Sequence, residues 1–199
     1  MGYPPFFDQA RKITLRDPLA ELLGAASQGL IEYSYADVVR LAGHSCPTVA
    51  GAYIMTIRAL AVLYGDDVPR RGGIRVELRD DAASGVTGVI ANVVAFITGA
   101  AADMGFKGLA GRHDRRNLLF FNAAIDGDIR YQRTDTGAAA TVSYHPEVVP
   151  SQTGAGPLLQ SVLNGSADGD AKRRFALCWQ ERVRQILDRA DDPHLVTVR

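Results

Sequence analysis

The sequence predicts an α+β protein with mixed helices, a sheet that is largely antiparallel, and a helical segment at the C-terminal end. Several segments carry apolar residues at helical spacing, while others alternate polar and apolar residues as strands do. These helix-like and strand-like segments follow one another irregularly, which favours an α+β fold over a doubly wound parallel sheet. A Thr-Asp-Thr-Gly turn between two strand-like segments adds an antiparallel hairpin.

Three helices are expected in the first third of the chain. Pro18 suits the first turn of one helix, Ser34 can cap a second, and Pro47 opens a third that is strongly apolar. Glycines mark the ends of these helices, at Gly24 or Gly29, at Gly43 and at Gly65.

The middle of the chain predicts the sheet and one buried helix. Residues 86–97 are rich in Val, Ile and Ala, which is typical of a helix buried on all sides. The strand-like segments are residues 74–79, 118–121, 129–131 and 140–144.

Pro and Gly residues at 146–156 predict a linker. It divides the chain into an α+β domain at 1–150 and a helical extension at 151–199, with a short helix at 158–163 and a long one at 171–190. The long helix is amphipathic, and we expect its largely apolar face to pack on the core or on a partner subunit. The residues on that face are Phe175, Cys178, Trp179, Arg182, Val183 and Ile186.

Composition limits the function classes. Of 199 residues, 47% are hydrophobic and 22% charged, and 22 Lys and Arg balance 22 Asp and Glu. Because a nucleic-acid-binding protein would normally carry a basic surplus, we expect no nucleic-acid partner. The longest apolar candidate, residues 85–102, is interrupted by Asn92 and Thr98, so we expect no membrane partner. No secretory signal is visible, and two cysteines are too few for a disulfide scaffold. A cytoplasmic protein is therefore expected.

His44 and Cys46 stand close together, directly before the apolar helix that Pro47 opens. The free N–H groups at a helix start favour an anion, and thiolate is the form of Cys that binds metals. An imidazole two residues earlier can ligate the same ion. Zinc normally takes three or four protein ligands, so others must come from elsewhere in the chain or from a second subunit. The further candidates are His113, His145, Asp103 and Asp114.

We expect a ligand pocket beside this pair, roofed by the glycine-rich loop at 98–111. Asn92 lies in an apolar helix, where its side chain either faces a ligand or satisfies groups in the core. Arg112 and His113 belong to a basic turn that can clamp a carboxylate or phosphate, or can simply be solvated beside Asp114. The candidate pocket residues are Ser45, Asn92, Thr98, Lys107, Arg112 and His113.

Two stretches of the chain also resemble a known family. Residues 42–51, Ala-Gly-His-Ser-Cys-Pro-Thr-Val-Ala-Gly, contain the pattern Gly-His-x-Cys-Pro and lead into a helix. Thr-Gly at 98–99 follows a buried helix, and Gly-Phe-Lys-Gly-Leu at 105–109 comes before a strand at 117–121. In this order the stretches resemble the FmdE family, named for one of the components of formylmethanofuran dehydrogenase, over residues 20–145.

The resemblance implies a dimeric α+β domain in which His44 and Cys46 line a cavity that can hold a metal, often zinc. Two positions depart from the archaeal pattern, because Val89 and Ala100 stand where that pattern has cysteines. We therefore expect a homodimeric, metal-binding protein with a pocket for a small ligand, accessory to a molybdenum or tungsten redox enzyme.

Three other interpretations of the same segment stay open. Thiolate and imidazole are both haem axial ligands, so Cys46 and His44 can belong to a haem-binding or haem-sensing module. Cys46 can also be an enzyme nucleophile with His44 as its base, although no third residue is evident to orient the pair. Finally, the segment can do no more than cap a helix, since free Cys is often just a small apolar residue.

Overall fold

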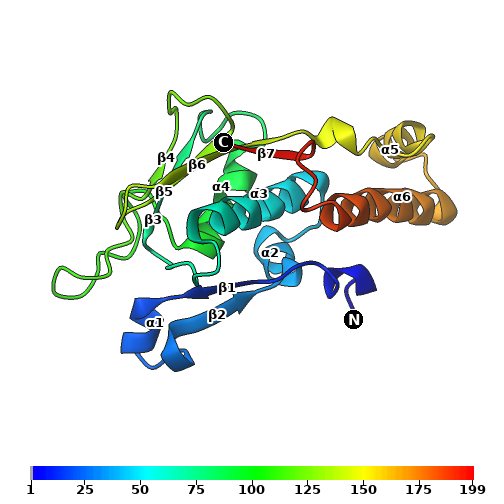
Figure 1. Cartoon of the computed structure of the whole chain (residues 1–199). Coiled ribbons are helices and arrows are strands. Elements are labelled where there is room, and N and C mark those ends of the chain that lie inside the picture. The colour runs from blue at the N-terminus through cyan, green and yellow to red at the C-terminus, as the bar shows by residue number, and fades with distance from the viewer. Residues whose placement is uncertain (1) are drawn as a thin grey trace.

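The computed structural model describes residues 2–199 and confirms the α+β fold. One layer is a five-stranded sheet in the order β4-β3-β5-β6-β7 (Figure 1). Neighbouring strands are antiparallel except β3 and β4, so the sheet is rich in antiparallel pairs as predicted. The strands are β3 (Ile74–Leu78), β4 (Leu119–Phe120), β5 (Ile129–Arg133), β6 (Ala139–Tyr144) and β7 (Val196–Val198).

Two apolar helices, α3 (Pro47–Tyr64) and α4 (Thr87–Thr98), pack against each other and against the sheet. Helix α3 contacts β5, β6 and β7, while α4 contacts β3. Tyr131 of β5 is fully buried at this boundary, and its hydroxyl donates to Thr56 Oγ1 of α3 at 3.0 Å. The core therefore lies between the sheet and this helix pair.

Helix α3 is long and apolar enough to cross a membrane by length and composition alone. It is the one such helix within residues 2–199, and 72% of its 18 residues are buried inside the fold, as in the core helix of a globular domain. The apolar stretch singled out from the sequence, residues 85–102, instead forms α4 and the start of the following loop.

A small sheet at the N-terminal end was not expected from the sequence. Strands β1 (Ile13–Arg16) and β2 (Leu30–Tyr33) pair antiparallel, with α1 (Pro18–Leu22) between them. Each strand has only four residues, too few to show a clear alternation, and the intervening helix hides their relation. Helix α2 (Tyr35–Ala42) follows and ends at Gly43 as predicted.

The C-terminal segment contributes to the same core. Helices α5 (Ala155–Leu163) and α6 (Gly169–Asp188) pack together, and α6 lies against α3 (Figure 1). Strand β7, which the sequence analysis did not predict, then pairs with β6 through Tyr144 and Val196. The residues beyond 150 thus supply an edge strand of the sheet as well as two helices.

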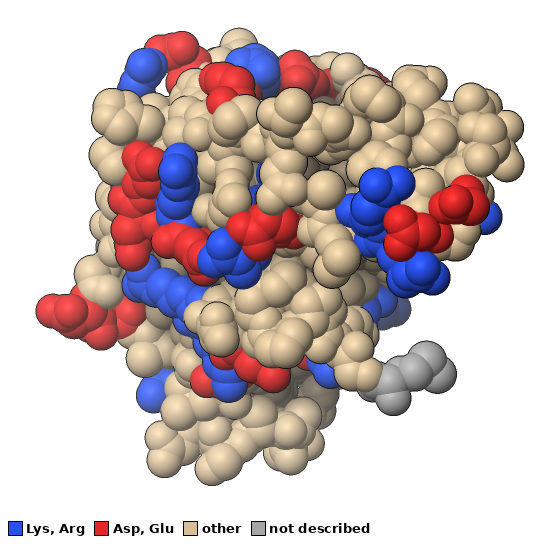
Figure 2. Space-filling model, turned by 90° about the vertical axis from the view of Figure 1, so that its right-hand side faces the viewer, with Lys and Arg blue, Asp and Glu red and all other residues tan. Residues whose placement is uncertain are grey.

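Charged side chains of both signs lie interspersed on the face that includes α6 (Figure 2). Uncharged areas separate them, and no extended basic stripe crosses this face. Several of the charges pair within α6 itself, for example Arg184 with both Glu181 and Asp188. This face therefore lacks the concentrated positive charge that nucleic-acid backbones attract.

Candidate functional site

The His44–Cys46 segment joins the end of α2 to the start of α3. Gly43 has a φ of 73°, the left-handed conformation that ends a helix and that glycine adopts without strain. Cys46 is the N-cap of α3, and its Sγ accepts a hydrogen bond from the Val49 N–H at 3.4 Å. The thiol is half-buried, so it faces the first turn of α3 without being sealed in the core.

The His44 ring is exposed and oriented by the backbone. Its Nδ1 lies 2.9 Å from the carbonyl oxygen of Ala42. Because a carbonyl oxygen only accepts, Nδ1 must carry the hydrogen, and in the neutral ring Nε2 then keeps its lone pair. Histidines that ligate metals are held by this kind of second hydrogen bond, which fixes both tautomer and ring direction.

Ser45, between the two candidate ligands, is held by helix α6. Its backbone carbonyl accepts from Trp179 Nε1 at 3.0 Å and from Gln180 Nε2 at 3.2 Å. Its hydroxyl donates to Gln180 Oε1 at 3.0 Å and accepts from the Tyr35 hydroxyl at 2.9 Å. Burial raises the pKa of Tyr35, so this phenol stays protonated and available as the donor. Ser45 is therefore an anchor of the segment and does not line the cavity beside His44.

A cavity of about 140 Å³ lies beside His44, between the end of α2 and α4. Asn92 and Val89 of α4 line it together with His44. The structure thus brings His44 to Asn92, as expected of a shared pocket. It also places Val89 in the lining of this cavity, at a position where the resemblance to the FmdE family would imply a cysteine. The apolar side chain of Val89 offers no metal ligand there.

The other predicted pocket residues lie away from His44. Thr98 is fully buried at the end of α4, where its hydroxyl donates to Val94 O at 2.8 Å. Lys107, Arg112 and His113 belong to the loop that follows this end, and none of them lines the His44 cavity. Val89 and Thr98 are separated by nine residues of helix, roughly 13 Å along its axis. The loop therefore does not roof the cavity, contrary to the expectation from the sequence.

His44 and Cys46 are the two candidate metal ligands that this segment offers. Within residues 2–199, no three His, Cys, Asp or Glu side chains lie close enough to hold an ion together. Among the further candidates, His145 instead pairs with Glu147 at 3.4 Å, and Arg116 engages both carboxylate oxygens of Asp114. Arg116 holds the pKa of Asp114 at about 2. Imidazole nitrogen and thiolate sulfur are donor types that zinc accepts, but Cys46 does not line the cavity beside His44. In a zinc site here, water, a ligand or a second chain would have to fill the other positions.

A buried ionic cluster of Asp17, Arg71 and Arg115 was missed by the sequence analysis. Asp17 is 3% exposed and Arg115 is 7% exposed. The two Asp17 oxygens accept from Arg71 Nη1 at 2.9 Å and from Arg115 Nη2. Asp17 also caps α1 by accepting from the Leu19 N–H at 2.9 Å, which is the role that its position before Pro18 indicates. The cluster ties the N-terminal sheet to the loop after α4.

The same cluster explains two features of the backbone around it. Arg71 donates to the carbonyl oxygens of Phe96 and Ile97 at the end of α4. Gly72 has a φ of 74°, and a Cβ at this position would overlap the Arg115 guanidinium. Only glycine both adopts this backbone and leaves room for the buried arginine.

The pKa of Asp17 predicts how this cluster responds to acid. Burial acts to raise that pKa, but the Arg71 hydrogen bond, the Arg115 charge and two backbone N–H groups together hold it below 3.8. A carboxyl whose pKa is lowered by folding stabilises the fold above its unfolded pKa, and that stabilisation is lost as the pH falls through the folded value. In urea unfolding, the advantage of wild type over Asp17→Asn should be full at pH 6 and shrink below about pH 3.8. An advantage that stays the same down to pH 2.5 would contradict this account.

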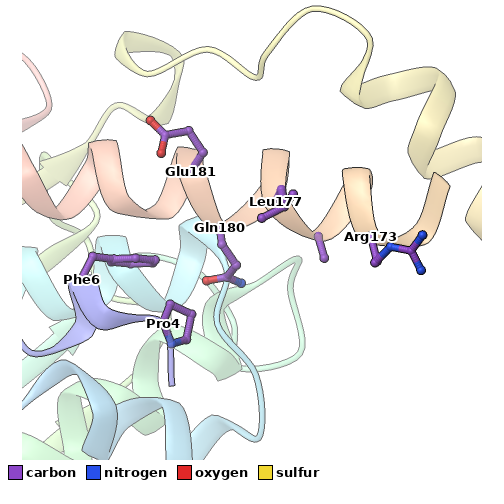
Figure 3. Close-up of a pocket in the computed structure, with 7 residues that line it drawn as sticks. Pro4, Phe6, Arg173, Leu177, Gln180 and Glu181 are labelled. Atoms are coloured by element: carbon purple, nitrogen blue, oxygen red, sulfur yellow. The ribbon is translucent and has the colours of Figure 1, made fainter. Parts of the chain in front are cut away.

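A larger groove of about 510 Å³ lies between the N-terminal segment and α6 (Figure 3). Pro4 and Phe6 line it on one side, and Leu177 and Gln180 line it from α6. Gln180 connects this groove with the candidate segment, because the same side chain bonds Ser45. The aromatic residues of α6 are evident in the sequence, but no local pattern indicates their contact with the N-terminal segment.

Compared with family models, curated proteins and solved structures, the chain shows no match. The resemblance to the FmdE family therefore stays a prediction from the two sequence stretches.

Proposed function

We propose that this chain binds a divalent metal, with zinc as the first candidate, through His44 Nε2 and Cys46 Sγ. The cavity beside His44 would admit a small ligand to the same place. A zinc ion bound there would act as a Lewis acid toward a coordinated ligand or water. On the resemblance alone, we extend the proposal to a homodimer that is accessory to a molybdenum or tungsten redox enzyme.

The observation that carries the proposal is the hydrogen bond between His44 Nδ1 and Ala42 O at 2.9 Å. It leaves Nε2 as the free acceptor on an exposed ring, two residues from a half-buried thiol at a helix N-terminus. Imidazole nitrogen and thiolate sulfur are a ligand combination that zinc accepts. The Ser45 contacts to α6 keep the backbone between the two ligands in place.

The measurement is elemental analysis of protein purified without a metal-affinity tag and dialysed against zinc. We expect one metal ion per chain in the wild type and none in the His44→Ala, Cys46→Ser double variant, because both protein ligands are then gone. Cys178→Ser and His113→Ala are the matched controls, and both should keep the metal. Wild-type protein without stoichiometric metal would overturn the proposal.

Light scattering on the same samples tests how the metal is shared. A ratio of one metal per two chains, together with a dimer that requires metal, would mean that two His-Cys pairs enclose one ion. Such a site has four protein ligands and no open position. That result would keep metal binding and the dimer but contradict the small-ligand part of the proposal.

Haem is the alternative occupant of the segment. The cavity that His44 lines is about 140 Å³, below the roughly 300–1,000 Å³ of sites for drug-sized ligands. We therefore place metal first and expect no Soret band when haem is added to the purified protein. If a Soret band does form and the Cys46→Ser variant lacks it, haem binding would replace metal binding as the proposed function.

A further inference from the structure

A cavity of about 320 Å³ opens on a different face of α4 from the His44 cavity. It lies where the first turn of α4 meets the ends of β3 and β6 and the start of β5. Its volume is within the roughly 300–1,000 Å³ of small-molecule sites. Neither His44 nor Cys46 lines it, so an occupant would not depend on the proposed metal site.

The floor of this cavity is apolar and reaches the core. Met55, Leu78 and Ile129 line it, and each is at most 2% exposed. Ile90 of α4 lines it as well and is half-buried. An apolar group that enters the cavity would therefore leave water for a well-packed apolar surface, which favours binding.

Tyr144 forms a wall that is fixed from behind. Its hydroxyl donates to the carbonyl oxygen of Pro47 at 3.0 Å. Its ring packs directly on Gly51 of α3, where a Cβ would collide with the ring. Because the phenol is held at both its ring and its hydroxyl, the cavity is already shaped without an occupant.

Carboxylates lie at the rim of the cavity. Asp80 and Asp128 both line it, and Arg79 lies between them, 3.3 Å from Asp80 Oδ1 and 3.0 Å from Asp128 Oδ1. One guanidinium thus serves two carboxylates, which leaves one negative charge in excess. The second oxygen of Asp128 accepts from the Tyr144 N–H at 2.8 Å, whereas that of Asp80, whose side chain is 51% exposed, accepts no hydrogen bond from residues 2–199.

The hydroxyl of a largely buried residue adds a second unused polar group. Thr87, in the first turn of α4, lines the cavity and is only 7% exposed. Its hydroxyl makes no hydrogen bond to any other residue of the described chain, 2–199, and its oxygen is not sealed from solvent, so it is open to an occupant of the cavity. The cavity therefore combines an apolar floor with a free carboxylate oxygen and a free hydroxyl.

We propose that this cavity binds a small primary amine with an apolar body. The body would lie on Met55, Leu78 and Ile129, and the ammonium group would donate to Asp80 Oδ2. The Thr87 hydroxyl is available to a second polar atom of the ligand. A charged hydrogen bond to a carboxylate is stronger than a neutral one, which gives the site a preference for amines over uncharged analogues.

The test compares 2-phenylethylamine with 2-phenylethanol, which has nearly the same shape but no charge, by NMR titration in the millimolar range at neutral pH. Wild type should bind the amine about tenfold more tightly than the alcohol. Asp80→Asn should lower the affinity for the amine to that for the alcohol. The matched control is Asp126→Asn, because Asp126 is an exposed carboxylate paired with Arg199 and does not line the cavity.

A blocking variant shows whether binding occurs in this cavity. Val86 lies at the rim and is 52% exposed, so Val86→Trp should fold and close the opening. We expect it to abolish binding of both probes. The proposal is overturned if wild type shows no saturable binding of the amine, if amine and alcohol bind equally, or if the amine still binds to Val86→Trp.

Discussion

Replacing Asp17 with alanine is expected to lower the free energy of unfolding by about 3–5 kcal/mol. Arg71 and Arg115 would both lose the carboxylate that compensates their charge. The Arg115 side chain is only 8% exposed, so water cannot take the place of that carboxylate. A domain of ordinary stability has about 5–15 kcal/mol in total, so this one change removes a large part of it. Urea unfolding at pH 7 measures the loss.

One further loss acts in the same direction, and one feature of Arg115 makes the site less tolerant of it. Asp17 caps α1 through the Leu19 and Ala20 N–H groups, and removing such a cap typically costs about 1 kcal/mol. Among residues 2–199, Arg115 Nε is already buried without a hydrogen-bond partner, so this guanidinium lacks one hydrogen bond even when Asp17 is present. Asp17→Asn keeps the shape and part of the cap, and we therefore expect it to lie between alanine and wild type.

The control is Asp126→Ala. Asp126 also pairs with an arginine, Arg199, but its side chain is 94% exposed. Surface pairs of this kind contribute about 0–1 kcal/mol, so the control should unfold close to wild type. If Asp17→Ala costs no more than this control, the buried cluster does not stabilise the fold and the connection between the N-terminal sheet and the loop must rest on other contacts.

This cluster shows what the sequence can and cannot predict. Pro18, Pro47, Gly43 and Gly65 act within one turn of the backbone, so the helices that they begin or end could be placed from the sequence. Asp17 and Arg115 are separated by 98 positions, and no local pattern links them. Strand β7 could not be predicted for a similar reason. Its three residues are too few to show the polar and apolar alternation of a strand, and their pairing with β6 is distant in sequence.

In the candidate site too, the local features could be predicted from the sequence and the long-range contacts could not. That Cys46 stands at a helix start follows from Pro47, and the structure places it as the N-cap of α3. The direction of His44 depends on one bond to Ala42, and the position of Ser45 depends on Trp179, 134 positions away. The sequence identified Trp179 as part of a packing face, but it could not identify the surface that the face covers.

Trp179→Ala is expected to destabilise the fold by roughly 2 kcal/mol, because a half-buried Trp loses less than the about 3–5 kcal/mol of a fully buried one. Its effect on the proposed metal binding should be of similar size in free energy. Without the Trp179 N–H, Ser45 O keeps only the longer bond from Gln180, at 3.2 Å, so the backbone between His44 and Cys46 is held less firmly. Loss of groups that orient metal ligands typically weakens affinity about 10–100-fold.

Two variants separate the anchoring of Ser45 from general stability. Trp179→Phe keeps an aromatic ring against Phe175 but removes the indole N–H, so metal affinity should fall while most of the stability remains. Leu177→Ala changes a neighbouring residue of α6 that is 71% exposed, and it should alter neither quantity. A competition titration with a zinc chelator gives the affinities, and thermal unfolding of the metal-free proteins gives the stabilities. If Trp179→Phe binds zinc as wild type does, the bond to Ser45 serves only to dock α6, and the ligand geometry must be set by α2 and α3 alone.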